Sequence, residues 1–211
     1  MSNSERIAIY IDRKNFNKNY SKRGYRVSED GFVPFDVWQS LNSNIIKIYD
    51  EKSNSDGKNS PHIDHHVHHL GTWLFVSERT DFLSMEIIDP KALAKEKKFL
   101  KFMKSVDSLY GYNIKYGTRI SDGKNERIKG VDINIVCHMM HNAFQDHYDV
   151  AILVTDNEEF VPVVEMVQDE FGKQVYHMGF AEDRLRATCF GNIPIEQPDY
   201  NKWLPKKEDK K

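Results

Sequence analysis

The sequence predicts an α/β fold with a central, mostly parallel sheet of about five strands. Two observations support this. Short apolar runs of strand length alternate along the chain with stretches whose apolar residues recur at helical spacing. The runs are apolar throughout, which is typical of parallel strands covered on both faces. We expect strands at residues 7–11, 72–76, 113–116, 150–154 and 174–178.

Helices are predicted between and after these strands, at residues 34–50, 91–110, 131–143, 161–171 and 185–190. The third begins after Lys129 and Gly130 and has one apolar face, made by Ile135, Val136, Met139, Met140 and Ala143. Asp132 lies at the start of this helix, on the same inward face. Residues 51–61 and 117–130 are predicted to be loops, and a short polar turn is expected after Asp12.

Length and composition indicate one domain at residues 1–192, with a His-rich insertion at 51–71 and a charged tail at 193–211. The formal net charge is −2, so nucleic-acid binding would need a local basic patch. Cys137 and Cys189 are expected to be buried free thiols. The sequence has no signal-peptide pattern and no apolar run long enough to span a membrane. We therefore expect a soluble, cytoplasmic protein.

The insertion contains residues 62–69, which hold five of the nine histidines. Imidazoles four residues apart can share a metal ion, and the segment contains an Asp-His-His triplet. Zinc ligands normally lie on a rigid frame, which the preceding Ser-Pro loop does not provide. The favoured interpretation is a solvated or partner-facing segment.

Acidic side chains are predicted to meet at one edge of the sheet. Asp12 follows the first strand, Asp132 starts a helix, and the loop at 156–159 follows the strand at 150–154. Asp12 alone could simply cap the segment that follows it. Together, neighbouring carboxylates repel one another unless a cation is present, and Mg²⁺ binds one or two carboxylates, waters and phosphate oxygens. This set suits phosphodiester hydrolysis.

These residues lie in three motifs: Ile-Tyr-Ile-Asp12-Arg-Lys-Asn15-Phe16, Lys129-Gly-Val-Asp132, and Thr155-Asp-Asn-Glu-Glu159-Phe160. In this order, the motifs resemble the NYN domain, a branch of the PIN-like ribonucleases, and look most like its bacterial LabA-type members. The resemblance covers roughly residues 6 to 190. It implies a Rossmann-like, three-layer PIN-like sandwich, a divalent Mg or Mn ion and cleavage of RNA.

The third motif departs from the family pattern, Ser-Gly-Asp-x-Asp-Phe. With Phe160 aligned, Thr155 takes the place of Ser, Asp156 of Gly, Asn157 of the first Asp and Glu159 of the second. His138 also stands where relatives often have Asp. The resemblance implies that Asp12, Asp132, Asp156 and Glu159 are the catalytic and metal-binding residues. The expected substrate-binding residues are Asn15, Thr155, Asn157, Arg119, Lys124, Arg127 and Lys129.

Two functions follow from this set. The first is a metal-dependent endoribonuclease that cleaves RNA, with single-stranded RNA as the more expected substrate. The second is a degenerate NYN domain that binds RNA or a protein without cutting, which the neutral Asn157 favours. DNA or a nucleotide as substrate stays open, because no residue distinguishes a reader of the 2′-hydroxyl. No membrane partner is expected, and the chain could form a homodimer.

Overall fold

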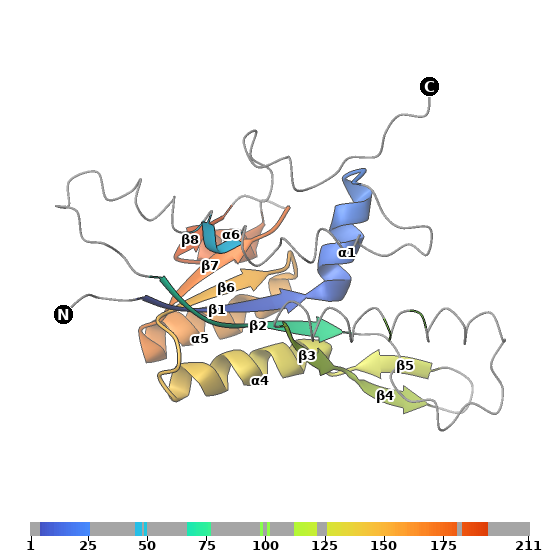
Figure 1. The fold of residues 1–211 in the computed structure, drawn as a ribbon, viewed down its shortest axis with the longest axis horizontal. Helices are drawn as coiled ribbons and strands as arrows, with labels where there is room; N and C mark the ends of the chain where they lie inside the picture. The colour runs from blue at the N-terminus through green and yellow to red at the C-terminus, as the bar shows by residue number, and fades with distance from the viewer. Residues whose placement is uncertain are drawn as a thin grey trace.

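The structure, a computed structural model, describes residues 5–25, 45–47, 49, 67–76, 98, 101, 112–121, 126–180 and 183–193. Six strands in these ranges form one sheet in which every neighbouring pair is parallel (Figure 1). They are β1 (Glu5–Asp12), β2 (Val67–Val76), β3 (Tyr112–Tyr116), β6 (Val150–Val154), β7 (Gln174–Met178) and β8 (Gly191–Asn192). The predicted α/β fold is confirmed, and all five predicted strands are present. The short strand β8 was not predicted.

The order of the strands across the sheet is β3-β2-β1-β6-β7-β8. The chain runs outward on one side from β1 and on the other side from β6, so the strand order reverses between these two. Their register pairs Ile7 with Val150 and Ile11 with Val154, which sets the carboxyl ends of both strands level. In open parallel sheets, ligands bind beside such a point of reversal. Asp12 and Thr155 are the residues that emerge there.

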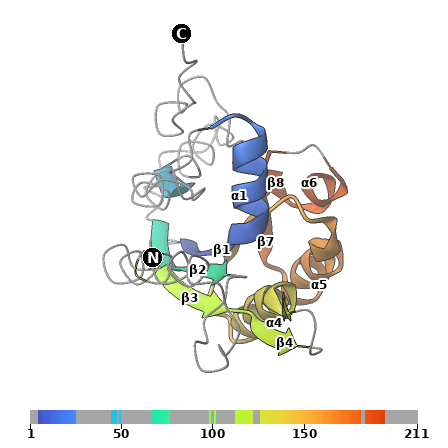
Figure 2. The ribbon, with the colours of Figure 1, turned by 90° about the vertical axis from the view of Figure 1, so that its right-hand side faces the viewer.

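Helices lie on both sides of the sheet (Figure 2). The helices α4 (Val131–Phe144) and α5 (Val161–Phe171) cover one face of the sheet. The helix α1 (Arg13–Lys22) starts at the carboxyl end of β1 and lies on the other side of the sheet. Helix α6 (Arg184–Thr188) precedes β8. The 3-10 turn η1 (Glu158–Phe160) leads into α5, which ends at Gly172 as predicted.

The core forms where β1 and β6 pack against α4 and α5. Ala8, Tyr10, Ala151 and Leu153 of the two strands contact a cluster from the helices that includes Ile135, Met139, Val164 and Val167. The alternate residues Ile7, Ile9 and Ile11 are also fully buried. Both faces of the central strands are therefore covered, as the continuous apolar runs predict.

A hairpin stands where a loop was predicted. Strands β4 (Thr118–Ser121) and β5 (Glu126–Lys129) pair antiparallel, with Thr118 opposite Lys129. Gly130 then takes a φ of 80° directly before α4. This left-handed conformation is one that glycine adopts without the steric penalty of a Cβ.

Other expectations are corrected. Instead of a short turn, Asp12 is followed by the ten-residue helix α1. Strand β2 begins at Val67 rather than at 72, so His68 and His69 pair with β1. Cys137 is exposed and Cys189 is half-buried, although both are free thiols as predicted. Within the described residues, no helix is long and apolar enough to cross a membrane.

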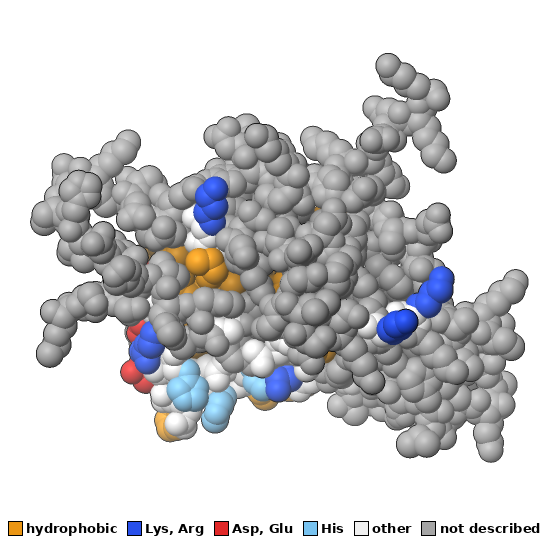
Figure 3. Space-filling model, viewed as in Figure 1, with side chains coloured by type: hydrophobic (Ala, Val, Ile, Leu, Met, Phe, Trp, Pro, Cys, Tyr) orange, Lys and Arg blue, Asp and Glu red, His pale blue; other side chains and the backbone are white. Residues whose placement is uncertain are grey.

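Two predicted helices fall mostly outside the described residues. Of residues 34–50, only 45–47 and 49 are described, and of residues 91–110 only 98 and 101 are, all of them helical. The histidines at 62, 65 and 66 and the tail at 194–211 also lie outside the described part of the chain. Other histidines can be seen along α4 in Figure 3, and α4 carries His138 and His141.

Candidate active site

Asp12 and Thr155 meet because the two central strands end side by side. Thr155 Oγ1 donates a hydrogen bond to Asp12 Oδ2 at 3.4 Å. The other oxygen of Asp12, Oδ1, accepts from the backbone N–H of Asn15 at 3.1 Å and so caps α1. Asp12 is only 5% exposed. Asp12 can therefore cap α1 and also belong to the acidic site, because the cap uses only its Oδ1.

Asp132 lies close enough to Asp12 and to Glu159 for like charge to act between the members of each pair. Burial raises the pKa of Asp12 above its ordinary value, and the charge of Asp132 raises it further, while hydrogen bonds from Asn15 and Thr155 offset part of the change. Asp132 is only partly shielded from solvent, but this partial burial and the charge of Glu159 raise its pKa, and Lys14 partly opposes them. Asp132 is therefore the acid that connects this group, since its charge acts on Asp12 and the charge of Glu159 acts on it.

Asp132 does not point into the core. It lies in the first turn of α4, but its side chain is exposed, as is that of Glu159 in η1. The buried positions of α4 are Val131, Ile135, Met139, Asn142 and Ala143. The expectation of an inward-facing Asp132 is therefore wrong, because this residue is exposed at the start of α4.

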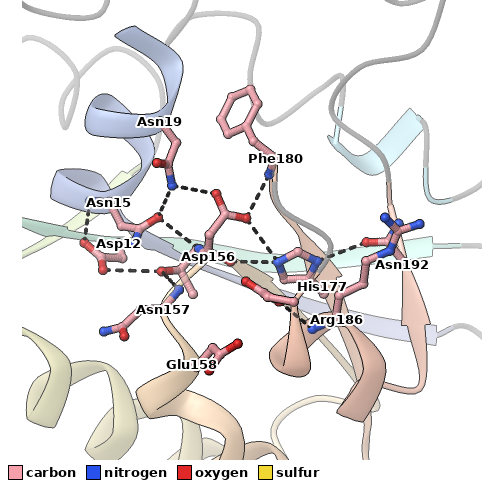
Figure 4. Close-up of polar contacts among 12 residues, drawn as sticks. Asp12, Asn15, Asn19, Asp156, Asn157, Glu158, His177, Phe180, Arg186 and Asn192 are labelled. Carbon is pink, nitrogen blue, oxygen red and sulfur yellow. Dashed lines mark hydrogen bonds and ion pairs between the residues drawn. The ribbon is translucent and has the colours of Figure 1, made fainter. Parts of the chain in front are cut away.

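Asp156 has a different environment. Its Oδ2 accepts from Asn19 Nδ2 at 2.6 Å, and its Oδ1 accepts from the backbone N–H of Phe180 at 2.8 Å and lies 3.5 Å from His177 Nε2 (Figure 4). The side chain is 6% exposed. These contacts direct the carboxylate toward α1 and the end of β7. They do not join it to Asp12, Asp132 and Glu159, with which it was expected to share a metal ion.

The predicted substrate-binding residues divide into two groups. Asn15 Oδ1 accepts from the backbone N–H of Asp156 and from Asn19 Nδ2, both at 2.9 Å. Asn157 donates its backbone N–H to Thr155 Oγ1 at 3.2 Å. Asn15, Thr155 and Asn157 therefore belong to one hydrogen-bonded unit at the carboxyl edge.

The basic residues lie on or near the hairpin. Arg119 is in β4, and Arg127 and Lys129 are in β5, which joins α4 through Gly130. Lys124 lies outside the described residues. His138 of α4 packs its ring against Phe75, and burial together with Lys115 and His141 lowers its pKa. An imidazole is neutral or positive, so His138 cannot supply the negative charge that an aspartate would have at this position.

Sequence reasoning missed Asn19, His177 and Phe180. His177 is fully buried at the end of β7. A lone imidazole in an otherwise apolar strand was the only signal that could have marked it. Asn19 and the backbone of Phe180 gave no such signal, because what marks them is a hydrogen bond to the Asp156 carboxylate. Asn19 is 137 positions away from Asp156 in the sequence.

The donor set suits a hard divalent cation, since carboxylate oxygens are the ligands that Mg²⁺ and Mn²⁺ prefer. Within the described ranges, no three His, Cys, Asp or Glu side chains converge closely enough to enclose an ion. Mg²⁺ does not require such a cage, because it commonly binds through one or two carboxylates and keeps several waters. Asp12 and Asp132 could provide those carboxylates.

The chain is similar to a solved structure and to a known protein family. A protein of unknown function from Vibrio parahaemolyticus RIMD 2210633 has a similar fold, with a TM-score of 0.56 and 19% identity over 93% of this chain and 96% of that one. Comparison with curated proteins finds no match. The NYN domain model matches residues 6–196, nearly the whole described structure. The chain therefore belongs to the NYN domain family, whose fold is of the PIN-like nuclease type.

Proposed function

We propose that the protein is a metal-dependent ribonuclease that hydrolyses RNA phosphodiester bonds. The observation that supports this most is the group of Asp12, Asp132 and Glu159 at the reversal point of the sheet. Burial and like charge raise the pKa of Asp12 and Asp132, so the ionised group is unfavourable without a cation. Perturbed acids of this kind are common at functional sites.

The bound ion would be Mg²⁺ or Mn²⁺, held by Asp12 and Asp132 with Glu159 nearby. Such an ion supplies an activated water and stabilises the charge that develops on the phosphate oxygens. Asp12 is prepared for this role, because Asn15 N–H and Thr155 Oγ1 fix the direction of its carboxylate. Fixed ligands lose little freedom when the ion binds.

Other residues would hold the RNA. Asn15 Oδ1 is committed to the Asp156 N–H and to Asn19, which fixes the amide plane. Its Nδ2 has no hydrogen-bond partner among the described residues, and a fixed donor beside Asp12 suits a phosphate oxygen. Lys14, Arg119, Lys124, Arg127 and Lys129 would add the positive charge that a nucleic-acid backbone requires.

The test is cleavage of a labelled single-stranded RNA with Mn²⁺, beside a DNA of the same sequence. Asp12→Asn is the site variant, and Asp169→Asn, an exposed acid on α5, is the matched control. We expect cleavage of RNA by the wild type and the control, and none by Asp12→Asn or after addition of EDTA. Full cleavage by Asp12→Asn would contradict the assignment of the site, and cleavage of DNA alone would contradict the substrate.

A second candidate function is RNA binding without cleavage, which the neutral Asn157 in the acidic loop favours. Fluorescence anisotropy with the same RNA separates the two. Binding of RNA by folded wild type that neither cleaves nor takes up Mn²⁺ would support this second function and overturn the first.

A further inference from the structure

The Asp156 carboxylate connects two elements that are far apart in the sequence. Asn19 of α1 donates to one oxygen at 2.6 Å. Phe180 N–H, just beyond β7, donates to the other oxygen at 2.8 Å, and His177 of β7 lies 3.5 Å from it. These donors fix the orientation of the nearly buried carboxylate. Turning it away would leave the donors without an acceptor, which is costly in a buried place. Its oxygens are therefore committed to holding α1 against the end of β7.

His177 continues this connection into the acidic loop. Its Nε2 lies 2.8 Å from the carbonyl oxygen of Thr155, which can only accept, so Nε2 carries the hydrogen. The same residue, Thr155, contacts Asp12 through Oγ1. The imidazole thus restrains the backbone from which the Thr155 hydroxyl reaches the site.

The other ring nitrogen of His177 faces Asn192 of β8 at 3.0 Å (Figure 4). The Asn192 amide can face the ring in two orientations. With its Nδ2 toward the ring, it donates to His177 Nδ1 at 3.0 Å and to the His177 carbonyl oxygen at 3.2 Å, and its Oδ1 accepts from Arg186 Nε at 3.2 Å. With Oδ1 toward the ring, Asn192 accepts from a protonated imidazole. Burial lowers the pKa of His177, but hydrogen bonds to Asp156, Asn192 and Thr155 more than offset this and raise it. In both protonation states Nε2–H still donates to Thr155.

Gly179 allows these groups to approach so closely. A Cβ at this position would lie 2.0 Å from Asp156 Oδ1 and 2.5 Å from His177 Nε2. No side chain fits there without displacing one of them. The glycine therefore lets the chain beyond β7 reach the Asp156 carboxylate.

We propose that Asp156 and His177 are positioning residues of the site, and that Asp156 is not a metal ligand. Asp156 holds Asn15 through its own backbone N–H and holds Asn19 through its carboxylate, while His177 holds the carbonyl of Thr155. Together they set where the Asn15 amide and the Thr155 hydroxyl lie relative to Asp12. This inference rests on the proposed metal-dependent nuclease function.

The first test is a titration with Mg²⁺ of protein labelled with ¹³C-aspartate. NMR signals of the side-chain carboxyl carbons are monitored at each Mg²⁺ concentration. We expect the Asp12 and Asp132 signals to shift and those of Asp156 and the exposed control Asp169 to stay in place. A shift of Asp156 equal to that of Asp12 would overturn the inference and leave the metal site intact. No shift at any aspartate would overturn both the inference and the proposed function.

The second test separates positioning from folding. His177→Gln retains a side-chain N–H that can reach the Thr155 carbonyl, whereas His177→Leu removes it, and His147→Leu is an exposed control. We expect Asp156→Asn and His177→Leu to lower kcat by about 10- to 100-fold with little change in KM, and His177→Gln to recover much of the loss. If His177→Leu does not fold, Asp156→Asn and His177→Gln carry the test. Wild-type kcat in Asp156→Asn would overturn the inference.

Discussion

Asn157 and Glu159 are joined by two hydrogen bonds within the acidic loop. Asn157 Oδ1 accepts from the backbone N–H of Glu159 at 3.2 Å, and Asn157 Nδ2 donates to Glu159 Oε2 at 3.4 Å. The amide therefore caps η1 and also contacts the Glu159 carboxylate. An aspartate here could keep the cap, but it would place a second negative charge against Glu159.

This pair predicts opposite effects of Asn157→Asp with and without metal. In metal-free protein the added charge should lower Tm, because two carboxylates would then face each other. With Mn²⁺ the added ligand should increase the metal-induced rise in Tm above that of the wild type. Thermal unfolding in EDTA and in Mn²⁺ measures both. A variant less stable than the wild type by the same amount in both conditions would show that position 157 does not face the ion.

Asp12→Asn should leave the fold intact and should not lower the stability of metal-free protein. Asn is as good an N-cap as Asp, so the start of α1 is retained. The folded-state pKa of Asp12 is raised, so its contribution to stability is present below the unfolded value of 3.8 and is lost as pH rises through the folded pKa. Near neutral pH the ionised Asp12 is destabilising, and the neutral amide removes that penalty. A Tm well below that of the wild type in EDTA would contradict this account.

Mn²⁺ or Mg²⁺ should raise the Tm of the wild type and leave Asp12→Asn unchanged. A ligand that binds only the folded state stabilises it by about 2.7 kcal/mol at about 100 times its Kd. For a chain of this length, that is a rise of about 5–10 °C. Differential scanning fluorimetry over a metal titration checks the effect, with Asp169→Asn as control. Equal shifts in the wild type and Asp12→Asn would place the ion elsewhere.

The opposite end of β1 is held by an ion pair that should affect stability alone. Arg6 donates to both oxygens of Asp149, at 3.0 and 2.6 Å, and also contacts Asp146. The hydrogen bond from Arg6 holds the pKa of Asp149 below its ordinary value. Its contribution to stability is therefore present above the unfolded value of 3.8 and is lost as pH falls through the lower folded pKa.

Asp149→Asn should destabilise the protein near neutral pH by about 1 kcal/mol, since solvent screens this partly exposed pair. The difference from the wild type should shrink as pH falls below 3.8, where the carboxylate begins to be protonated. Thermal unfolding across this range provides the measurement. Cleavage should not change, because the pair lies at the amino end of β1 and Asp12 at the carboxyl end.

The sequence alone predicted the five longest strands of the parallel sheet, the helices α4 and α5, and a group of acids at the carboxyl edge of the sheet. Local patterns suffice for these features. An apolar run buried on both faces predicts a parallel strand, and an acid directly after such a strand must emerge at the carboxyl edge. The motifs around Asp12, Asp132 and Glu159 also carried the family assignment. What these local patterns could not give was the direction of a side chain whose partners are distant in the chain.

The tertiary structure decided the surroundings of the Asp156 carboxylate. In sequence it is one more acid in an acidic loop, beside Glu158 and Glu159. Its hydrogen-bond donors, Asn19 and the Phe180 N–H, lie 137 and 24 positions away, and they turn its carboxylate toward α1 and β7. The burial of His177, the strand β8 and the β4–β5 hairpin likewise depend on pairing between separate segments. Such pairing is set by packing and long-range hydrogen bonds, which no short window of sequence contains.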